Sequence, residues 1–247
     1  MSELKSLEVY ADKADLIAGI DARLEGVISQ LLMTQPLVHV VLTGGTVGIT
    51  MLEPIDTDNL LDWSRIHLWW GDERFVPSDS PDRNEGQAQR ALLHRLPIPA
   101  GNIHRMPATD AGLSLDDAAA SYSAELATFA APGSAEPAFD VLILGIGPDA
   151  HVASLFPGHP GVHDNSAAAI AVRDSPKPPP ERVSLSLETI NAAQRVWVIA
   201  AGADKAEAVE AAFTATDASV APASAVEGTI ETIFFTDEAA ASLVVSA

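Results

Sequence analysis

The segment FDVLILGIGPDAHVASLFPG, residues 139–158, decides the fold class. It begins with a short, uninterrupted apolar run, which is typical of a strand buried on both faces of a parallel sheet. The glycines at positions 145 and 147 end the strand in a turn, and a polar loop with Asp149 and His151 follows. The segment therefore predicts a buried strand whose carboxyl end carries a loop able to do chemistry.

Three other segments repeat this arrangement of an apolar run and a polar loop: LVHVVLTGGT (37–46), RIHLWWGDERFV (65–76) and RVWVIAAGADKAEAV (195–209), which continues into a helix. A last strand and a short terminal helix follow in ETIFFTDEAAASL. Apolar residues at three- and four-residue spacing predict a helix at 12–33, and the segments 83–96 and 114–130 are also expected to be helical, the last with Ser114 as N-cap. This alternation predicts an α/β fold: a doubly wound, mostly parallel, Rossmann-like sheet with helices on both faces.

The bulk composition limits the possible classes of protein. With 47% hydrophobic residues in 247, the chain is expected to form one domain over 1–247, although two small ones would also fit. The proline-rich stretches AAPGSAEPAFD and DSPKPPPERV are interpreted as loops, and neither is long enough for an interdomain linker. The chain has no cysteine, which excludes disulfides, thiol nucleophiles and thiolate metal sites.

The net charge of −20 argues against binding to nucleic acid or to anionic membranes, because both carry the same sign. No secretory signal or membrane span is recognisable, so the expected location is the cytoplasm. The oligomeric state is left open. Only 14 residues are Lys or Arg, so a cation beside a motif is informative, and a local cluster of cations can still bind a small phosphorylated substrate.

In open parallel sheets, ligands bind at the carboxyl ends of the strands, so the four polar loops are expected to meet in one crevice. Gly44, Gly45 and Thr46 offer backbone N–H groups to a phosphate or a sugar oxygen. Arg74 suits phosphate recognition, and Asp72 suits sugar hydroxyls. The alternatives are a plain strand-to-helix turn for the glycines and solvated charges for the other two residues.

His151 is the candidate general base, because imidazole titrates near neutral pH, and Asp149 is the candidate group that orients it. Lys205, expected in the first turn of a helix, is placed to meet an anion there, although a solvated lysine is the alternative. A histidine cluster of His151, His159 and His163 would suggest a metal. Pro160 and Gly161 prevent helical pairing of the last two histidines, so no metal is expected.

The same loop satisfies the dinucleotide pattern G-x-G-x-x-A through Gly145, Gly147 and Ala150. However, Asp149 would lie beside the pyrophosphate, and Asp164, at the expected distance for a ribose ligand, does not follow a strand. We therefore interpret the pattern as a false match and expect neither a nucleotide nor another cofactor.

Taken together, the ordered motifs LTGGT, WWGDERFVP followed by Asn84, LGIGPDAHVASLFPG, SPKPPPERVSLSLETIN and GADKA closely resemble the lactonase branch of the glucosamine-6-phosphate isomerase/6-phosphogluconolactonase superfamily. The resemblance covers nearly the whole chain. It implies a doubly wound α/β fold, no cofactor, and hydrolysis of 6-phospho-D-glucono-1,5-lactone to 6-phosphogluconate in the oxidative pentose phosphate pathway, with a small phosphorylated sugar lactone as the partner.

The isomerase and deaminase branch remains the alternative, but it usually has an acidic residue shortly after the histidine, where this chain has SLFPG. A non-enzymatic sugar-phosphate-binding protein and a cofactor-dependent oxidoreductase are two further alternatives. The chain also departs from the common family pattern. Val47 and Val152 stand where hydroxyl residues are usual, and Ala150 stands where a glycine is usual.

Overall fold

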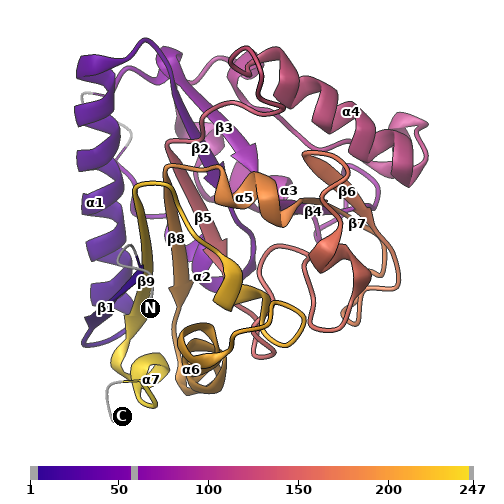
Figure 1. The fold of residues 1–247 in the computed structure, drawn as a ribbon. Coiled ribbons are helices and arrows are strands. Elements are labelled where there is room, and N and C mark those ends of the chain that lie inside the picture. Colours follow the sequence, from indigo (N-terminus) through magenta and orange to yellow (C-terminus); the bar gives the residue numbers. More distant parts are fainter. Residues whose placement is uncertain (1–4, 57–60, 245–247) are drawn as a thin grey trace.

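The computed structural model describes residues 5–56 and 61–244, and its centre is a six-stranded parallel sheet in the order β1-β9-β8-β5-β2-β3 (Figure 1). The strands are β1 (Lys5–Tyr10), β2 (Val38–Leu42), β3 (Ile66–Trp70), β5 (Val141–Gly145), β8 (Arg195–Ala200) and β9 (Glu231–Asp237). All residues of β2 and β3 are buried, as their continuous apolar runs predict. The predicted α/β class with a parallel sheet is confirmed.

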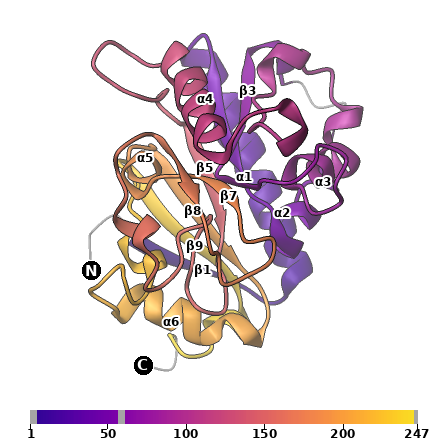
Figure 2. The ribbon, with the colours of Figure 1, turned by 90° about the vertical axis from the view of Figure 1, so that its right-hand side faces the viewer.

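Helices lie on both sides of this sheet. The helices are α1 (Lys13–Thr34), α2 (Gly45–Thr50), α3 (Asn84–Ala91), α4 (Leu115–Thr128), α5 (Leu187–Asn191), α6 (Ala206–Thr214) and α7 (Glu238–Ala241). Helix α1 packs along β1 and β9 on one side, and α4 lies across the sheet from it (Figures 1 and 2). The side chains of Asp12 and Ser114 accept backbone hydrogen bonds and begin α1 and α4, which confirms the predicted N-cap at Ser114.

A second, three-stranded antiparallel sheet was not predicted. It consists of β4 (Asp72–Arg74), β7 (Arg182–Leu185) and β6 (Ala169–Val172). The strand predicted at the start of the segment 65–76 is confirmed as β3, but the polar loop predicted to follow it contains a second strand, β4. The chain leaves the parallel sheet after β3, and Gly71 joins the two sheets, since its N–H donates to Leu42 and its carbonyl accepts from Leu185. The last residues of the predicted loop DSPKPPPERV likewise form the start of β7.

One helix boundary and one edge strand also differ from the prediction. The helix predicted over 83–96 stops at Ala91, because Leu92 leaves the helical conformation with φ −139° and ψ −52°, and only a short 3₁₀ turn, Leu93–Arg95, follows. Strand β1 was missed: it is a sheet edge with a half-exposed pattern and few β-branched residues. Within the described residues, no helix combines the length and the apolar character needed to cross a membrane.

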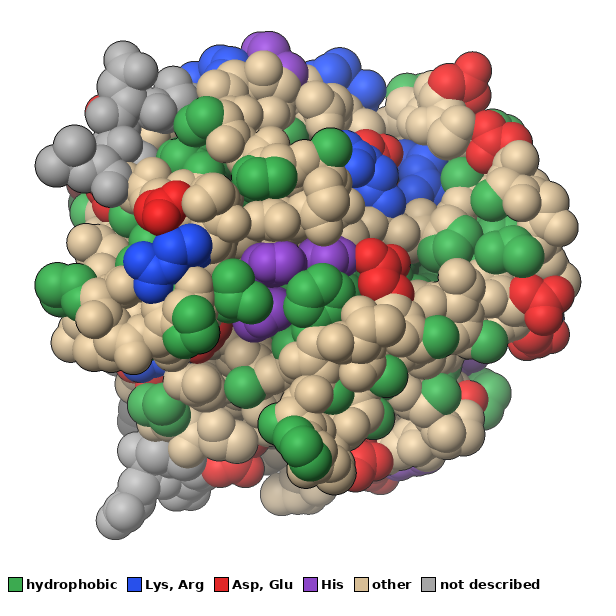
Figure 3. Space-filling view, turned by 90° about the horizontal axis from the view of Figure 1, so that it is seen from above, with side chains coloured by type: hydrophobic (Ala, Val, Ile, Leu, Met, Phe, Trp, Pro, Cys, Tyr) green, Lys and Arg blue, Asp and Glu red, His purple; other side chains and the backbone are tan. Residues whose placement is uncertain are grey.

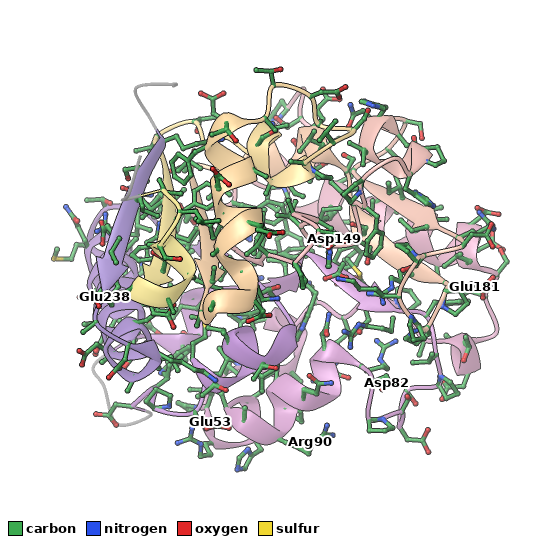
Figure 4. All side chains as sticks on the ribbon, turned by 90° about the horizontal axis from the view of Figure 1, so that it is seen from below. Glu53, Asp82, Arg90, Asp149, Glu181 and Glu238 are labelled. Carbon is green, nitrogen blue, oxygen red and sulfur yellow. The ribbon has the colours of Figure 1, made fainter. Side chains whose placement is uncertain are left out.

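The amino ends of β2 and β3 carry a cluster of buried histidines. His39 and His67 lie side by side in the register of the two strands, and His67 Nδ1 lies 2.8 Å from His104 Nε2. Figure 3, which views this end of the sheet, shows histidine side chains gathered in a hollow. The carboxyl ends of the strands, seen in Figure 4, lie on the opposite side of the molecule, where Asp149 is labelled near the middle of the view.

Candidate active site

A cavity of about 270 Å³ opens where β2 and β5 end. All four polar loops reach it, since Gly44, Gly45, Thr46, Asp72, Arg74, His151 and Lys205 line it. Asp149 lies directly behind His151 and contacts its ring. The structure thus brings together the candidate residues that the sequence places at four different strand ends.

His151 and Asp149 are two residues apart and meet because the loop turns sharply. The N–H of Ala150 donates to the carbonyl of Gly147, and the N–H of Gly147 donates to the carbonyl of His151. Ala150 has φ 61°, a conformation that alanine rarely adopts, which explains why glycine is usual here. The turn places His151 Nδ1 2.5 Å from Asp149 Oδ1, and only 16% of the His151 side chain is exposed.

A lysine that the sequence analysis missed completes this group. Lys177 Nζ lies 3.2 Å from Asp149 Oδ1 and 3.2 Å from His151 Nδ1. Burial alone raises the pKa of the Asp149 carboxyl, but the hydrogen bonds and charges of His151 and Lys177 outweigh burial and hold this pKa well below its usual range. Asp149 is therefore ionised near neutral pH and accepts hydrogen bonds from both neighbours.

The glycine loop is a strand-to-helix turn that also lines the cavity. Gly44 is the N-cap of α2, and Gly45 has φ 80°, which favours glycine. A Cβ at Gly44 would lie 1.9 Å from Asn84 Oδ1, so the glycine is needed for close approach to Asn84. Asn84 is itself buried and lines the cavity, and its Nδ2 donates to the carbonyl of Asp72.

The two acids of the GDER motif have different environments. Glu73 is 1% exposed and points away from the cavity, where it accepts hydrogen bonds from the N–H groups of Arg74, Asn84 and Glu85. Burial raises the pKa of Glu73, opposed by Arg83 and these three N–H groups. Glu73 therefore anchors the start of α3, and Asp72 is the acid that faces the cavity.

The carboxylate of Asp72 is held by Ser154 and by Arg182, which lies on β7 of the three-stranded sheet. Ser154 Oγ donates to Asp72 Oδ2 at 2.6 Å, and Arg182 Nη1 lies 3.8 Å from the same oxygen. Arg182 is 5% exposed, and it donates to the carbonyls of Lys177, Pro178 and Pro179. From the sequence alone, the segment with Lys177 and Arg182 is interpreted only as a proline-rich loop. Two cations in a chain that has only 14 are the signal that could have drawn attention to it.

Cations are concentrated at this edge of a strongly acidic protein. A second cavity of about 460 Å³ adjoins the first and shares Gly44, Gly45, Thr46 and Lys205 with it. Together the two cavities are lined by Lys13, Arg74, Lys177, Arg182 and Lys205. Lys205 lies at the end of a 3₁₀ turn and is the N-cap of α6, so it precedes the helix by one residue. The local field therefore favours an anion despite the net charge.

The other two histidines of the possible metal cluster lie apart from His151. His159 Nε2 lies 2.7 Å from the Arg173 carbonyl, and His163 Nε2 lies 2.6 Å from Ser219 Oγ. Across 5–56 and 61–244, no three or more His, Cys, Asp or Glu side chains are grouped so as to hold a metal ion.

The dinucleotide pattern lacks its structural context, because turns and not a helix follow Gly147. Of the departures from the family pattern, Val152 is fully buried in the core, whereas Val47 lines the second cavity. Of these two valines, only Val47 therefore changes the wall of a cavity.

Comparison with known proteins shows the family of the chain. The family model of glucosamine-6-phosphate isomerases/6-phosphogluconolactonase matches residues 11–234. The chain is 45% identical to a 6-phosphogluconolactonase of Streptomyces coelicolor, over 98% of this chain and 95% of that protein. It is 42% identical to the 6-phosphogluconolactonase of Mycobacterium tuberculosis, with coverage of 96% and 97%.

A similar structure has also been solved. The crystal structure of 6-phosphogluconolactonase from Thermotoga maritima matches with a TM-score of 0.83 and 27% identity, covering 94% of this chain and 99% of that one. The fold and the full-length sequence similarity lead to the same conclusion. The chain belongs to the glucosamine-6-phosphate isomerase/6-phosphogluconolactonase family.

Proposed function

We propose that this protein is a 6-phosphogluconolactonase, which hydrolyses 6-phospho-D-glucono-1,5-lactone to 6-phosphogluconate, and that His151 is its general base. Curated relatives with 41–45% identity over nearly the whole chain carry this activity in their names. The observation that carries the proposal is the Asp149–His151 pair at 2.5 Å, set in a cavity lined by Arg74, Lys177, Arg182 and Lys205. A base beside a cluster of cations suits a substrate with a phosphate and a hydrolysable ester.

The first step is the activation of water. Because Asp149 is ionised, it accepts a hydrogen bond from the N–H group at His151 Nδ1, and the lone pair of the neutral ring is therefore on Nε2. Nε2 takes a proton from water, which attacks the lactone carbonyl, and the protonated ring then returns this proton to the departing ring oxygen. Such general-base help contributes about 10²–10⁴-fold, which is adequate for a reactive lactone.

The tetrahedral oxyanion needs hydrogen-bond donors. The N–H of Gly147 is already bonded to the His151 carbonyl, so it is not free to contribute. Gly44, Gly45 and Thr46 remain as the proposed donors, because the first N–H groups of a helix have no acceptor within the helix.

The phosphate is proposed to bind Arg74 and Lys205. Both side chains line the cavity, and Arg74 Nε has no hydrogen-bond partner although it is buried. Asp72, fixed by Ser154 and Arg182, is proposed to accept hydrogen bonds from the sugar hydroxyls. These roles divide the cavity into a phosphate end and a sugar end.

The two sheets support the proposal of one domain over 1–247, because both contribute residues to the same cavity: β2 and β5 lead into it, and Asp72 and Arg182 reach it from β4 and β7. A small phosphorylated sugar lactone remains the proposed partner, and the cytoplasm remains the proposed location. The acidic surface argues against nucleic acid and anionic membranes as partners.

Substrate preference tests the function. Initial rates of hydrolysis of 6-phosphogluconolactone and of unphosphorylated gluconolactone, each above its spontaneous rate, should differ strongly in kcat/KM in favour of the phosphorylated compound. Equal values for the two lactones would contradict the phosphate site. Ammonia release from glucosamine 6-phosphate, with no lactone hydrolysis, would instead assign the chain to the deaminase branch.

A further inference from the structure

Lys177 is held in place by its own loop. The carbonyl of Lys177 accepts hydrogen bonds from Ser175 Oγ at 2.9 Å and from Arg182 Nη2 at 3.1 Å. Arg182 also donates to the carbonyls of Pro178 and Pro179, which follow Lys177 in the chain. Because the backbone is anchored on both sides, the side chain projects from a fixed point, and its ammonium reaches the Asp149–His151 pair.

The three side chains form a compact triangle whose shortest contact, at 2.5 Å, favours one arrangement of protons. Lys177 Nζ has only donors, and ionised Asp149 has only acceptors. Asp149 Oδ1 lies 2.5 Å from His151 Nδ1 and 3.2 Å from Lys177 Nζ, so it accepts from both. A ring without a proton on Nδ1 would set its lone pair against a carboxylate oxygen, which is unfavourable. The base therefore has its lone pair on Nε2.

We propose that Lys177 is a positioning residue: its ammonium holds the Asp149 carboxylate beside His151 Nδ1 and opposes a positive charge on the imidazole ring. An aspartate alone beside a histidine favours the imidazolium, which cannot act as a base. The ammonium 3.2 Å from Nδ1 opposes that effect. The group has no net charge while His151 is neutral, and it becomes a cation after proton uptake, so Lys177 also favours return of the proton to the leaving oxygen.

The other charged groups around the cavity do not replace this role. Asp72 is paired with Arg182 at 3.8 Å, and both line the cavity. Arg74 donates to the Asp82 carbonyl, and Lys205 pairs with Asp204 at 3.5 Å. Within the described residues, Lys177 is the only Lys or Arg that forms an ion pair or a hydrogen bond with Asp149 or His151. Loss of its charge should therefore act on these two residues first.

The experiment compares wild type with Lys177→Met, Lys177→Arg and Arg173→Met. Lys177→Met keeps the length of the side chain and removes its charge. Arg173→Met removes a charge from the same loop, at an exposed residue that pairs with Asp116 away from the cavity, and is the matched control. The proton of His151 is followed by NMR titration of the imidazole, assigned with His151→Gln, and the lactonase pH–rate profile is recorded in parallel.

The expected result is that the His151 titration midpoint and the acid limb of the profile both move to higher pH in Lys177→Met, by about one pH unit if the 3.2 Å pair is screened as in water and by more if it is screened less. Lys177→Arg should return both toward wild type, and Arg173→Met should leave both unchanged. A raised KM with an unmoved midpoint would show that Lys177 binds substrate instead. A uniform loss of kcat without a midpoint shift would reduce its role to structure, and either result overturns the proposal.

The inference rests on the proposed function for its catalytic meaning, but the titration does not depend on turnover. If wild type fails to hydrolyse the lactone while the His151 midpoint still shifts in Lys177→Met, the function is wrong and the electrostatic role of Lys177 stands. If wild type is active and the midpoint does not move, the role of Lys177 is wrong and the function stands.

Discussion

Replacing Gly147 by alanine displaces His151, the candidate base, while leaving the histidine itself in the sequence. An added Cβ would lie 1.9 Å from His151 Nδ1, 2.0 Å from Cε1 and 2.5 Å from Asp149 Oδ1. Ordinary contacts to a Cβ begin at 3.4 Å, so the imidazole has to retreat by about 1.5 Å. Gly147 is not among the residues with positive φ, so alanine adds volume there without backbone strain.

A retreat of this size breaks the 2.5 Å hydrogen bond between His151 and Asp149 and moves Nε2 away from the water it activates. Because a misplacement of about 1 Å can cost about a hundredfold in rate, kcat should fall at least about a hundredfold in Gly147→Ala. KM should change little, since the proposed phosphate ligands Arg74 and Lys205 lie on other loops.

The assay is steady-state hydrolysis of freshly prepared 6-phosphogluconolactone, with thermal unfolding of each variant to show that it is folded. Gly71→Ala is the matched control, because a Cβ at Gly71 would meet its neighbours at 3.7 Å or more, which is ordinary contact. The control should retain most of the activity. Comparable kcat for Gly147→Ala and wild type would refute the reasoning.

Two further predictions concern the phosphate ligands and the histidine cluster. Arg74→Ala and Lys205→Ala should each raise KM by about tenfold to a hundredfold, because a hydrogen bond to a charged group usually contributes that much to binding. The effect on kcat should be smaller. Steady-state kinetics in which kcat falls and KM stays the same would contradict the assignment of these two residues to the phosphate. The pKa of His39 is lowered from 6.5 to about 4, mainly by burial and further by the neighbouring His67 and His104. Between pH 6.5 and pH 4, the imidazole of His39 therefore binds a proton in the unfolded chain but not in the folded protein. The free energy of unfolding should therefore fall, by up to about 3 kcal/mol, as the pH falls from 6.5 to 4; urea unfolding at pH 7 and 5 should show a smaller loss in His39→Gln, and an equal loss would contradict this origin.

The parts of the fold that were predictable depend on local patterns. A strand buried on both faces gives an uninterrupted apolar run, and parallel strands bring their carboxyl ends to one edge. The loops containing Gly44, Asp72, His151 and Lys205 could therefore be assigned to one crevice from sequence alone. The bend that brings Asp149 to His151 was harder to predict, because Ala150 adopts a left-handed conformation that the sequence would indicate only if a glycine stood there.

The small sheet could not be predicted for a physical reason. Strand β4 has three residues, and β6 and β7 have four each, which is too short for a periodic pattern. Their pairing is also distant in sequence, since Asp72 pairs with Ser184. Arg182 satisfies its charge with carbonyls of its own loop and with Asp72, an arrangement that exists only after the fold has formed.

Whether this chain hydrolyses the lactone with His151 as the base is tested by the initial rate of 6-phosphogluconolactone hydrolysis, measured for wild type and for His151→Ala side by side and above the spontaneous rate. We expect clear catalysis by the wild type and loss of most turnover in the variant, with substrate binding largely kept because Arg74 and Lys205 remain. Equal kcat for the two folded proteins would contradict the assignment of the base. Hydrolysis by neither would contradict the function.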